Sequence, residues 1–432
     1  LDFCDNAAIL FGVNGIGYYW SLGSSAVSDY LLAVGAKEYS TYFYHGIDDR
    51  ASLLSLSSVK YYICEKGNEE IVPYGFRKYK TITKPVPYSD RNLDVKKSDK
   101  KKRKSIYNIY VNDFALPLGY TYDKVISNKE LDTCNGTEKE EAMLQAAVVE
   151  EDTASETLKD ISLSSKELDY KVTCNPGVKY KNNRFVVTEK GAGVFVQFDT
   201  IKNKGLYVSI DNLSFKQDNP LSVFENQLES FSVAEQNLFE NRYKYWKEQN
   251  STGILFNSNG VYKQLAHYNA DNPRYNGRGN YVVNLGYSTE ERNGIYIYFN
   301  QTGTYRFDNL KLVEQSFDTY EQSIAHLKEN ILTNVKMTDN EVTGSIQLDK
   351  KKLLCLTIPY SSGWKIYVDG KETDLKKVNY MYSGVFLEQG EHNIRLQYCT
   401  PGIKTGMLIS GVGIFILLII VLAGYFYKNK EN

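Results

Sequence analysis

Hydrophobic and polar positions follow two different periods along this chain. Up to about residue 160, helix-like spacing of apolar residues is mixed with short runs typical of strands. From about residue 165 to 315, apolar residues alternate with polar ones or form short runs between Gly and Asn turns. A period of two indicates a half-buried strand, whereas spacing by three and four indicates a helix. The pattern therefore predicts a mixed α/β region followed by β-structure.

Shorter signals locate individual elements within this outline. Asp48 and Asp49 precede the run RASLLSLSSVKYYIC, where either carboxylate can cap a helix that gives way to a strand. Asp369-Gly370 separates two alternating runs and predicts a tight hairpin turn. Two pairs have the spacing of a capping box and predict helix starts: Thr137 with Glu140, and Ser232 with Glu235.

We predict an α+β multidomain fold. It comprises a mixed α/β domain, two β-sandwich modules of jelly-roll type and one C-terminal transmembrane helix. The predicted ranges are 1–160 for the extracytoplasmic mixed domain, 161–318 for a β-sandwich with a helical insert, 319–343 for a helical linker, 344–402 for the membrane-proximal sandwich, 405–427 for the transmembrane helix and 428–432 for a cytoplasmic tail.

The C-terminus carries the sharpest physical signal. From Gly406 to Tyr427 the sequence runs for 22 residues without a charge. A helix of that length is about 33 Å long, enough to cross a hydrocarbon core of roughly 30 Å. A buried core helix is the alternative, but core helices rarely run this long without a polar face. Because Lys428 and Lys430 follow, the positive-inside rule predicts a cytoplasmic tail and an extracytoplasmic bulk, although Lys404 weakens the asymmetry.

The N-terminus lacks the signals that export of such a bulk requires. The chain begins LDFCDNAAILFG, with no Met, no basic n-region and no apolar signal-peptide core. We therefore expect Leu1 to lie inside a longer protein, with an export signal or membrane region before it.

Charge and composition narrow the classes of protein further. Lys and Arg number 51 and Asp and Glu 52, so the basic excess of a general nucleic-acid binder is absent. The 36 Tyr are typical of a β-rich surface protein, because Tyr packs well on a half-exposed pleated face. Six widely spaced Cys do not form a disulfide scaffold. Cys355 and Cys399 lie on two predicted strands and either pair or remain separate buried thiols, and the second alternative is favoured.

No motif of self-sufficient catalysis occurs. The sequence has no HExxH, no GxSxG, no GxxxxGK[ST] and no GxGxxG, and its four His share no metal-ligand spacing. With 52 acidic residues, a carboxylate pair of the glycosidase kind carries almost no information. The sequence therefore identifies no catalytic residue, no metal ligand and no cofactor.

Two clusters in the first region hold side chains suited to sugar contact. Tyr18, Tyr19 and Trp20 follow a Gly-rich stretch, and their rings can stack on sugar faces, line a membrane interface or fill a domain core. The second cluster lies in HGIDDR and comprises His45, Asp48 and Asp49. Acids in such a position serve more often as a helix cap than as a catalytic pair.

A basic run and four tyrosines are the remaining candidates. Lys96 to Lys104 has seven basic residues in nine, among them Lys101, Lys102 and Arg103. Such a run suits an anionic polymer or lipid headgroups, and a solvated loop insertion is the favoured alternative. In the predicted sandwich, a carbohydrate-binding face, a core face and plain surface are the alternatives for Tyr287, Tyr296, Tyr298 and Tyr305.

Several segments together resemble the YfhO family of bacterial membrane proteins. They occur in the family's order, are specific as a set, and run from about Tyr18 to the last helix. The segments are VKYYI, VPYGF, YVNDFALPLGYTYD, NYVVNLGY, GTYRFDNLKL, PYSSGWKIYVDGK and GEHNIRLQYCTPGIKTG. Tyr19-Trp20-Ser21 also resembles the Tyr-x-Ser that begins the family's outer part.

This resemblance implies a function that composition does not show. The family is similar to polytopic GT-C glycosyltransferases, which transfer sugar from a polyprenyl-phosphate donor to a cell-surface polymer such as teichoic acid. The resemblance implies a bilayer, a lipid-linked sugar and an anionic cell-wall polymer as partners. The family's catalytic acid is expected in an early outer loop that this sequence lacks, so no catalytic residue is carried over. The chain would be the outer portion that positions the acceptor.

Two other classes of function remain as alternatives. One is a membrane-anchored carbohydrate-binding or adhesion protein without catalysis, and the other is an anchored glycoside hydrolase. The residues that precede Leu1 would separate the first alternative from the transferase, because a transferase needs many membrane helices there. Activity of the soluble part on glycans would favour the hydrolase.

Overall fold

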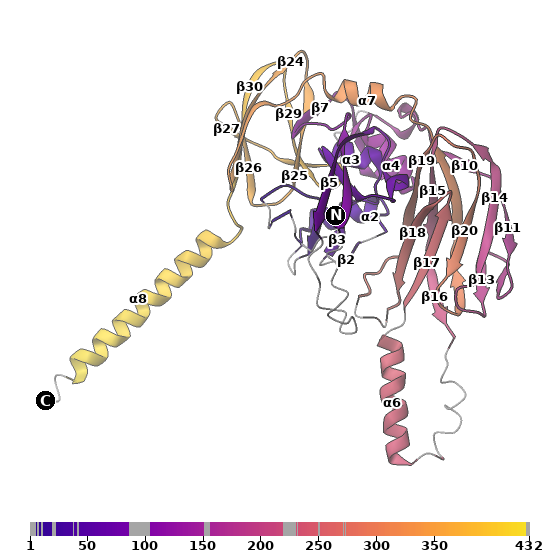
Figure 1. The fold of residues 1–432 in the computed structure, drawn as a ribbon. Coiled ribbons are helices and arrows are strands. Elements are labelled where there is room, and N and C mark those ends of the chain that lie inside the picture. Colours follow the sequence, from indigo (N-terminus) through magenta and orange to yellow (C-terminus); the bar gives the residue numbers. More distant parts are fainter. Residues whose placement is uncertain are drawn as a thin grey trace.

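The computed structural model shows a strand-rich body from which two helices project (Figure 1). It describes residues 6–428 except 7, 10–11, 20–22, 38, 41–42, 86–103, 151–155, 219–229, 231, 249–250, 271 and 273. The described strands form seven sheets, which we group into a first module, a sandwich and a C-terminal module. The predicted β-rich multidomain fold with a long apolar C-terminal helix is confirmed.

The first module surrounds a short central helix, α3 (Ala51–Leu56), whose six side chains are all buried. Two small antiparallel sheets flank it. Their strands, in spatial order, are β1 (Gly17–Tyr19), β3 (Phe43–His45) and β2 (Tyr39–Ser40), and then β4 (Tyr61–Glu65), β6 (Lys104–Asn112) and β5 (Phe76–Pro85). The other helical elements are α2 (Ser25–Ala33), α4 (Gly136–Met143) and the 3-10 turns η1 (Glu69–Ile71), η3 (Asn128–Leu131) and η4 (Leu158–Asp160).

Helix α3 begins without the acidic cap that its sequence suggests. Its N-cap residue is Arg50, which makes no side-chain capping bond. Asp48 and Asp49 both adopt the left-handed conformation, with φ of 57° and 55°, and so form a turn before the helix. Asp tolerates this conformation better than most residues do. Because neither carboxylate caps the helix, both are available for partners elsewhere.

The capping box of α4 lies two residues before the predicted one. Asn135 Oδ1 accepts from the Glu138 backbone N–H at 3.0 Å, and Glu138 Oε2 accepts from the Asn135 backbone N–H at 2.7 Å. Asn-x-x-Glu has the same spacing as the predicted Thr137-x-x-Glu140. The Asn135–Glu138 pair, which comes first in the sequence, therefore caps the helix. The carboxylate of Glu140 is not needed for capping and turns into the interior.

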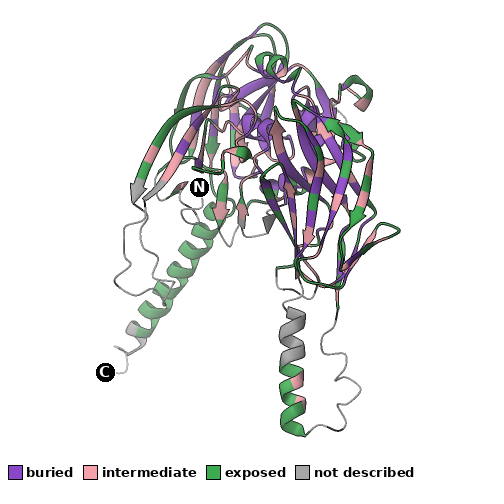
Figure 2. Ribbon diagram, turned by 45° about the vertical axis from the view of Figure 1, so that its right-hand side comes forward, coloured by how far each residue is buried: buried purple, intermediate pink, exposed green. Residues whose placement is uncertain are grey.

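The sandwich is antiparallel throughout and holds its own apolar core. One sheet contains β10 (Lys166–Leu168), β22 (Asn309–Gln315), β15 (Lys204–Asp211) and β19 (Tyr281–Ser288). The second contains β11 (Tyr170–Cys174), β14 (Gly193–Ile201), β20 (Arg292–Phe299), β17 (Ser251–Ser258) and β18 (Val261–Tyr268). A third, smaller sheet contains β12 (Val178–Tyr180), β13 (Arg184–Val187), β21 (Gly303–Arg306) and β16 (Ser214–Gln217). Figure 2 shows buried residues concentrated where the sheets face one another.

A helical insert interrupts the sandwich, as predicted. Helix α6 (Val233–Glu248) lies between β16 and β17 in the sequence and projects from the end of the sandwich (Figures 1 and 2). Its predicted capping box is present: Ser232 N–H donates to Glu235 Oε2 at 2.8 Å, and Glu235 N–H donates to Ser232 Oγ at 3.4 Å.

The C-terminal module shares a sheet with the first module. This six-stranded sheet contains β7 (Gly119–Tyr122), β25 (Lys352–Pro359), β29 (Tyr382–Leu387), β28 (Lys376–Val378), β9 (Ala147–Val149) and β8 (Val125–Ser127). It packs on a five-stranded sheet of β23 (Thr333–Met337), β24 (Glu341–Leu348), β30 (Gly390–Tyr398), β26 (Trp364–Val368) and β27 (Lys371–Thr373). The structure thus joins strands from the predicted ranges 1–160 and 344–402 in one sheet.

Local predictions within the C-terminal module fit this arrangement. Asp369 and Gly370, with φ of 51° and 80°, form the hairpin turn between β26 and β27. Within 319–343, predicted as a helical linker, the structure has the short helix α7 (Tyr320–Leu327), followed by strand β23 and the start of β24. Cys355 and Cys399 are separate thiols, as favoured, but only Cys355 is buried and Cys399 is exposed. Helix α8 (Ile403–Lys428) leaves the body directly after β30.

Candidate functional site

Strand pairing brings two of the predicted sugar-contacting clusters together. Strand β1 pairs with β3 in antiparallel register, so that Gly17 faces His45 and Tyr18 faces Tyr44. The rings of Tyr18 and Tyr44 stack with centroids 5.5 Å apart and an interplanar angle of 24°. Tyr19 is 48% exposed, and His45 is also exposed. Successive side chains of a strand point to opposite sides, so Tyr18 and Tyr44 lie on one side of this strand pair and Tyr19 and His45 on the other. We call these four residues together the β1–β3 face.

Partial burial sets the chemistry of the rings on the β1–β3 face. Burial, assisted by Tyr18, raises the pKa of Tyr44 to about 12, and burial also raises the pKa of Tyr18. Both phenols are therefore neutral hydrogen-bonding groups at physiological pH rather than anions. Neutral rings with hydroxyl groups suit the apolar faces and hydroxyl edges of sugars.

Asp48 and Asp49, in contrast, turn away from this face and bind the sandwich. Asp48 is buried, with Oδ1 3.1 Å from Lys263 Nζ and 3.4 Å from Lys37 Nζ. Asp49 Oδ2 lies 2.5 Å from the same Lys263 ammonium group. The Asn284 backbone N–H donates to Asp48 Oδ2 at 2.7 Å. We call this set of five residues the acidic junction.

The acidic junction is balanced in charge, and its side chains are buried except that of Asp49, which is 26% exposed. Burial alone would raise the pKa of Asp48, but the ammonium groups of Lys263 and Lys37 outweigh it and hold that pKa below its usual value. The Asn284 side-chain amide also donates to the backbone carbonyls of Asp48 and Asp49, at 3.0 and 3.1 Å. Asp48 is thus a fixed, paired anion that anchors the loop to β18 and β19.

A second buried network continues this contact between the modules. Arg50 is completely buried, with Nε 3.0 Å from Glu140 Oε2 and Nη2 2.7 Å from the Gly136 carbonyl oxygen. Gln315 of β22 donates to Glu140 Oε1 at 3.2 Å and accepts from Tyr207 Oη at 2.8 Å. Burial raises the pKa of Glu140 to about 7, although the Arg50 guanidinium opposes that shift.

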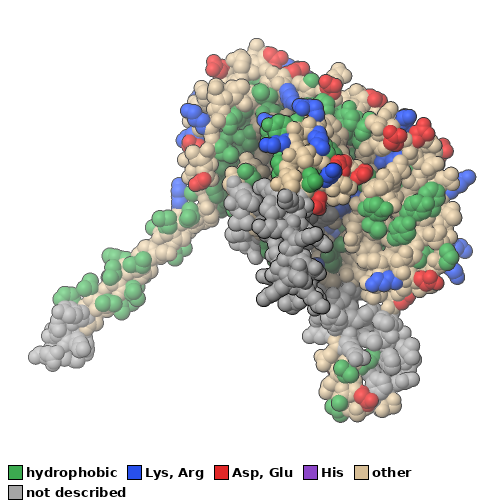
Figure 3. Space-filling model, viewed as in Figure 1, with side chains coloured by type: hydrophobic (Ala, Val, Ile, Leu, Met, Phe, Trp, Pro, Cys, Tyr) green, Lys and Arg blue, Asp and Glu red, His purple; other side chains and the backbone are tan. Residues whose placement is uncertain are grey.

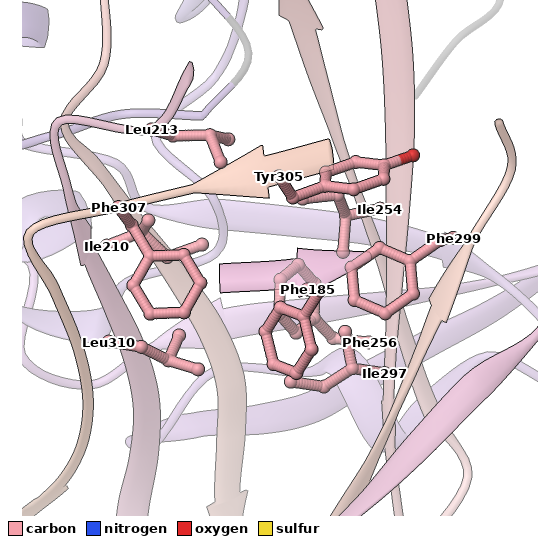
Figure 4. A pocket seen from close by; sticks show the side chains of 10 residues that line it. All are labelled: Phe185, Ile210, Leu213, Ile254, Phe256, Ile297, Phe299, Tyr305, Phe307 and Leu310. Carbon is pink, nitrogen blue, oxygen red and sulfur yellow. The ribbon is translucent and has the colours of Figure 1, made fainter. Parts of the chain in front are cut away.

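Two small spaces lie in the interior of the described body. In the sandwich core, apolar side chains and Tyr305 surround a space of about 20 Å³ (Figure 4). A second space of the same size, beside Glu141, is lined by polar groups that include Ser52, Ser164 and Gln315. Each has room for about one water molecule.

The remaining candidates divide as follows. Trp20, Lys101, Lys102 and Arg103 lie outside the described residues. Within the described part of the chain, no group of three or more His, Cys, Asp or Glu side chains has an arrangement able to hold a metal ion. Of the four sandwich tyrosines, Tyr305 is fully buried and Tyr287 packs against Phe317 and Tyr74 where the modules meet. Tyr296 and Tyr298 lie on the outer face of β20.

Sequence reasoning missed the partners of these residues. Lys263 is 215 positions from Asp48, and nothing near Lys263 distinguishes it from an ordinary strand lysine. The sequence pattern places Arg50 at the start of a helical run and Glu140 in a capping box, and neither pattern indicates the ion pair between them. One local signal could have indicated these contacts. Two consecutive Asp residues can adopt the left-handed conformation and form a turn, and in such a turn the carboxylates do not cap the helix that follows.

Comparison with known proteins places the chain in a family. Residues 1–410 match the family described as bacterial membrane protein YfhO. The uncharacterized protein YfhO of Bacillus subtilis (strain 168) is 25% identical over 437 residues, covering 99% of this chain and 42% of that protein. The chain thus spans about two fifths of the length of this curated relative.

Two solved structures show partial similarity at low identity. Both are cryo-EM classes of the R1389S mutant of arabinofuranosyltransferase AftD from mycobacteria, at 12% and 11% identity. Each alignment covers 39% of this chain and 13% of AftD, with a TM-score of 0.17. A superposition this limited supports no conclusion about fold or function. The family match over residues 1–410, in contrast, covers nearly the whole chain. The chain belongs to the YfhO family of bacterial membrane proteins.

Proposed function

We propose that this chain is the extracytoplasmic portion of a polytopic membrane glycosyltransferase. The enzyme would transfer sugar from a polyprenyl-phosphate donor to a cell-surface polymer such as teichoic acid, and this portion would position the acceptor. Membership of the YfhO family over residues 1–410 carries the proposal, because that family resembles GT-C glycosyltransferases. The apolar helix α8 supports it, since a lipid-linked donor requires an enzyme held at the membrane.

The position of the β1–β3 face suits this role. In Figure 1, β2 and β3 lie toward the side of the body from which α6 and α8 project. A lipid-linked donor confines the reacting phosphate to the headgroup plane. An acceptor held on this side of the body would therefore meet the donor in register, and fixed geometry of that kind can supply several kcal/mol of the barrier.

The side chains of the site would divide between contact and support. Tyr18, Tyr19 and His45 would contact the acceptor through ring faces and hydrogen bonds, with Trp20 as a further ring. The acidic junction would hold the loop after β3 against the sandwich, so that His45 keeps its position. Lys101, Lys102 and Arg103 would attract an anionic polymer, and their contribution would weaken with salt.

The proposal is tested on the full-length protein in membranes. The donor would be polyprenyl phosphate carrying ¹⁴C-glucose or ¹⁴C-N-acetylglucosamine. The measured quantity would be the radioactivity incorporated into purified teichoic acid. We expect Tyr19→Ala and His45→Ala each to lower transfer at least fivefold, mainly through a higher acceptor KM. Tyr79→Ala, which removes a 64% exposed tyrosine from β5, is the matched control. Absence of label with the wild-type protein and both donors would refute the transferase role.

A further inference from the structure

An aromatic surface covers the outer face of the five-stranded sandwich sheet. Phe195 of β14, Tyr296 and Tyr298 of β20, Leu255 of β17 and Tyr262 of β18 all point outward from their strands. Strand register places them side by side, with Phe195 opposite Tyr296, and Tyr298 opposite Leu255. Figure 3 shows the resulting group of hydrophobic side chains over these strands. We call these five residues the aromatic platform.

Two rings of the platform, Tyr296 and Tyr298, share one orientation, whereas Phe195 is tilted by 45° from Tyr296. Tyr296 and Tyr298 are nearly parallel, at 12°, with centroids 6.1 Å apart. Tyr298 lies across its neighbour Gly193, where an added Cβ would come within 2.6 Å of the ring. Glycine at this position lets the ring lie down on the sheet, so that its face is turned outward. The parallel neighbour Tyr296, 43% exposed, presents its face in the same direction.

Polar but uncharged groups are interleaved with the rings. Asn257 lies between Tyr296 and Tyr262 in the same cross-strand row, and Gln264 lies beside Leu255 in the next row. Asn257 Oδ1 is buried and has no hydrogen-bond partner within the described structure, whereas Gln264 is exposed. Thr173 extends the first row beyond Phe195. Neither row contains an Asp, Glu, Lys or Arg. Lys263 lies in β18 between Tyr262 and Gln264 but points to the opposite face of the sheet.

We propose that the aromatic platform is a binding site for neutral sugar rings. Ring faces pack on the apolar C–H faces of a pyranose, and the exposed Gln264 amide can bond its hydroxyl edge. The lack of charge disfavours a phosphate polymer, since nothing on these rows would pair with its anions. The ligand is therefore the glycan itself, whether it belongs to a polymer or is free. The site is separate from the β1–β3 face and does not depend on the proposed transfer reaction.

The test uses the purified full chain in a detergent without a sugar headgroup. Binding of maltohexaose, cellohexaose and mannohexaose is measured by calorimetry and by saturation-transfer NMR, with a glycerol phosphate hexamer as the charged probe. We expect at least one neutral hexasaccharide to bind and the phosphate polymer not to bind. Tyr296→Ala with Tyr298→Ala should weaken that affinity at least tenfold. Tyr296→Phe keeps the ring face and should remain within threefold of wild type.

A matched pair of exposed tyrosines serves as the control. Tyr61 and Tyr79 are 53% and 64% exposed on another sheet, and their rings are 6.4 Å apart but tilted by 51°. Replacing both with Ala should leave sugar affinity unchanged, and melting temperatures verify that each variant is folded. Binding of none of the three sugars would overturn the proposal, as would equal loss in the control pair. A platform variant that instead converts a dimer to a monomer would show that a second copy of the chain covers this surface.

Discussion

At the scale of single residues, His267 has a defined electrostatic role that no motif suggested. Its side chain lies inside the sandwich with 4% exposure, and Nδ1 is 3.0 Å from Tyr281 Oη. Burial, with the nearby Arg278 guanidinium, lowers the pKa of His267 to about 4. The imidazole is therefore neutral in the folded protein at pH values where a solvated histidine already carries a proton.

This burial predicts a loss of stability in mild acid. Between pH 6.5 and about 4 the unfolded chain binds a proton at His267 and the folded chain does not, so unfolding becomes more favourable as pH falls. The pKa shift of His267 corresponds to a loss of at most about 3 kcal/mol in the free energy of unfolding. His267→Gln should make the melting temperature less dependent on pH across this window, as measured by thermal unfolding in detergent. Identical pH profiles for the two proteins would contradict the assigned pKa.

At the scale of elements, one asparagine fastens the sheet that joins the two ends of the chain. Asn379 is fully buried with φ of 49°, and its Oδ1 accepts from the Val148 backbone N–H at 2.9 Å. Its Nδ2 donates to Tyr122 Oη at 2.8 Å. One side chain thus holds β28, from the C-terminal module, against β9 and β7 of the first module.

Removal of this side chain should loosen β9 selectively. Asn379→Ala leaves a buried N–H without a partner and strains the left-handed backbone, which together cost about 3 kcal/mol. Asn379→Gly loses the same hydrogen bonds but accommodates the positive φ, so it should be less destabilising than Ala. Hydrogen exchange measured by mass spectrometry should accelerate at residues 147–149 in both variants and stay unchanged in the sandwich. Unaltered exchange at 147–149 would argue against this role of Asn379.

At this scale, local elements could be predicted from the sequence, whereas pairing between distant strands could not. The Ser232–Glu235 cap, the Asp369-Gly370 turn and the apolar run of α8 were predictable because each depends on residues a few positions apart. The six-stranded sheet was not, since the pairing of Cys355 with Tyr120 is decided by packing between segments more than 200 positions apart. The candidate site followed the same rule: the exposed Tyr19 and His45 were found locally, whereas Lys263 and Arg50 depend on distant partners.

At the scale of the whole molecule, the apolar helix α8 determines how the body is held relative to a membrane. The most apolar 18-residue window within Ile403–Gly424 has a mean hydropathy of 2.8, and none of it is buried by the rest of the chain (Figure 2). An apolar surface of that length has to be covered by lipid or by other membrane helices. The exposed Cys399 lies four residues before the helix begins, so the membrane-proximal side of the body carries a natural chemical probe.

That thiol tests the proposed sidedness. If the bulk of the chain lies outside the cytoplasm, a membrane-impermeant maleimide added to intact cells should label Cys399. A full-length Cys399→Ser variant should lose the label at that position, while Cys174, the other exposed thiol among the described residues, keeps its own. A new thiol in the tail, Asn432→Cys, should react only after the cells are permeabilised, because the positive-inside rule places Lys428 and Lys430 in the cytoplasm. Labelling of the tail but not of Cys399 in intact cells would reverse the topology, and the β1–β3 face would then lie on the cytoplasmic side.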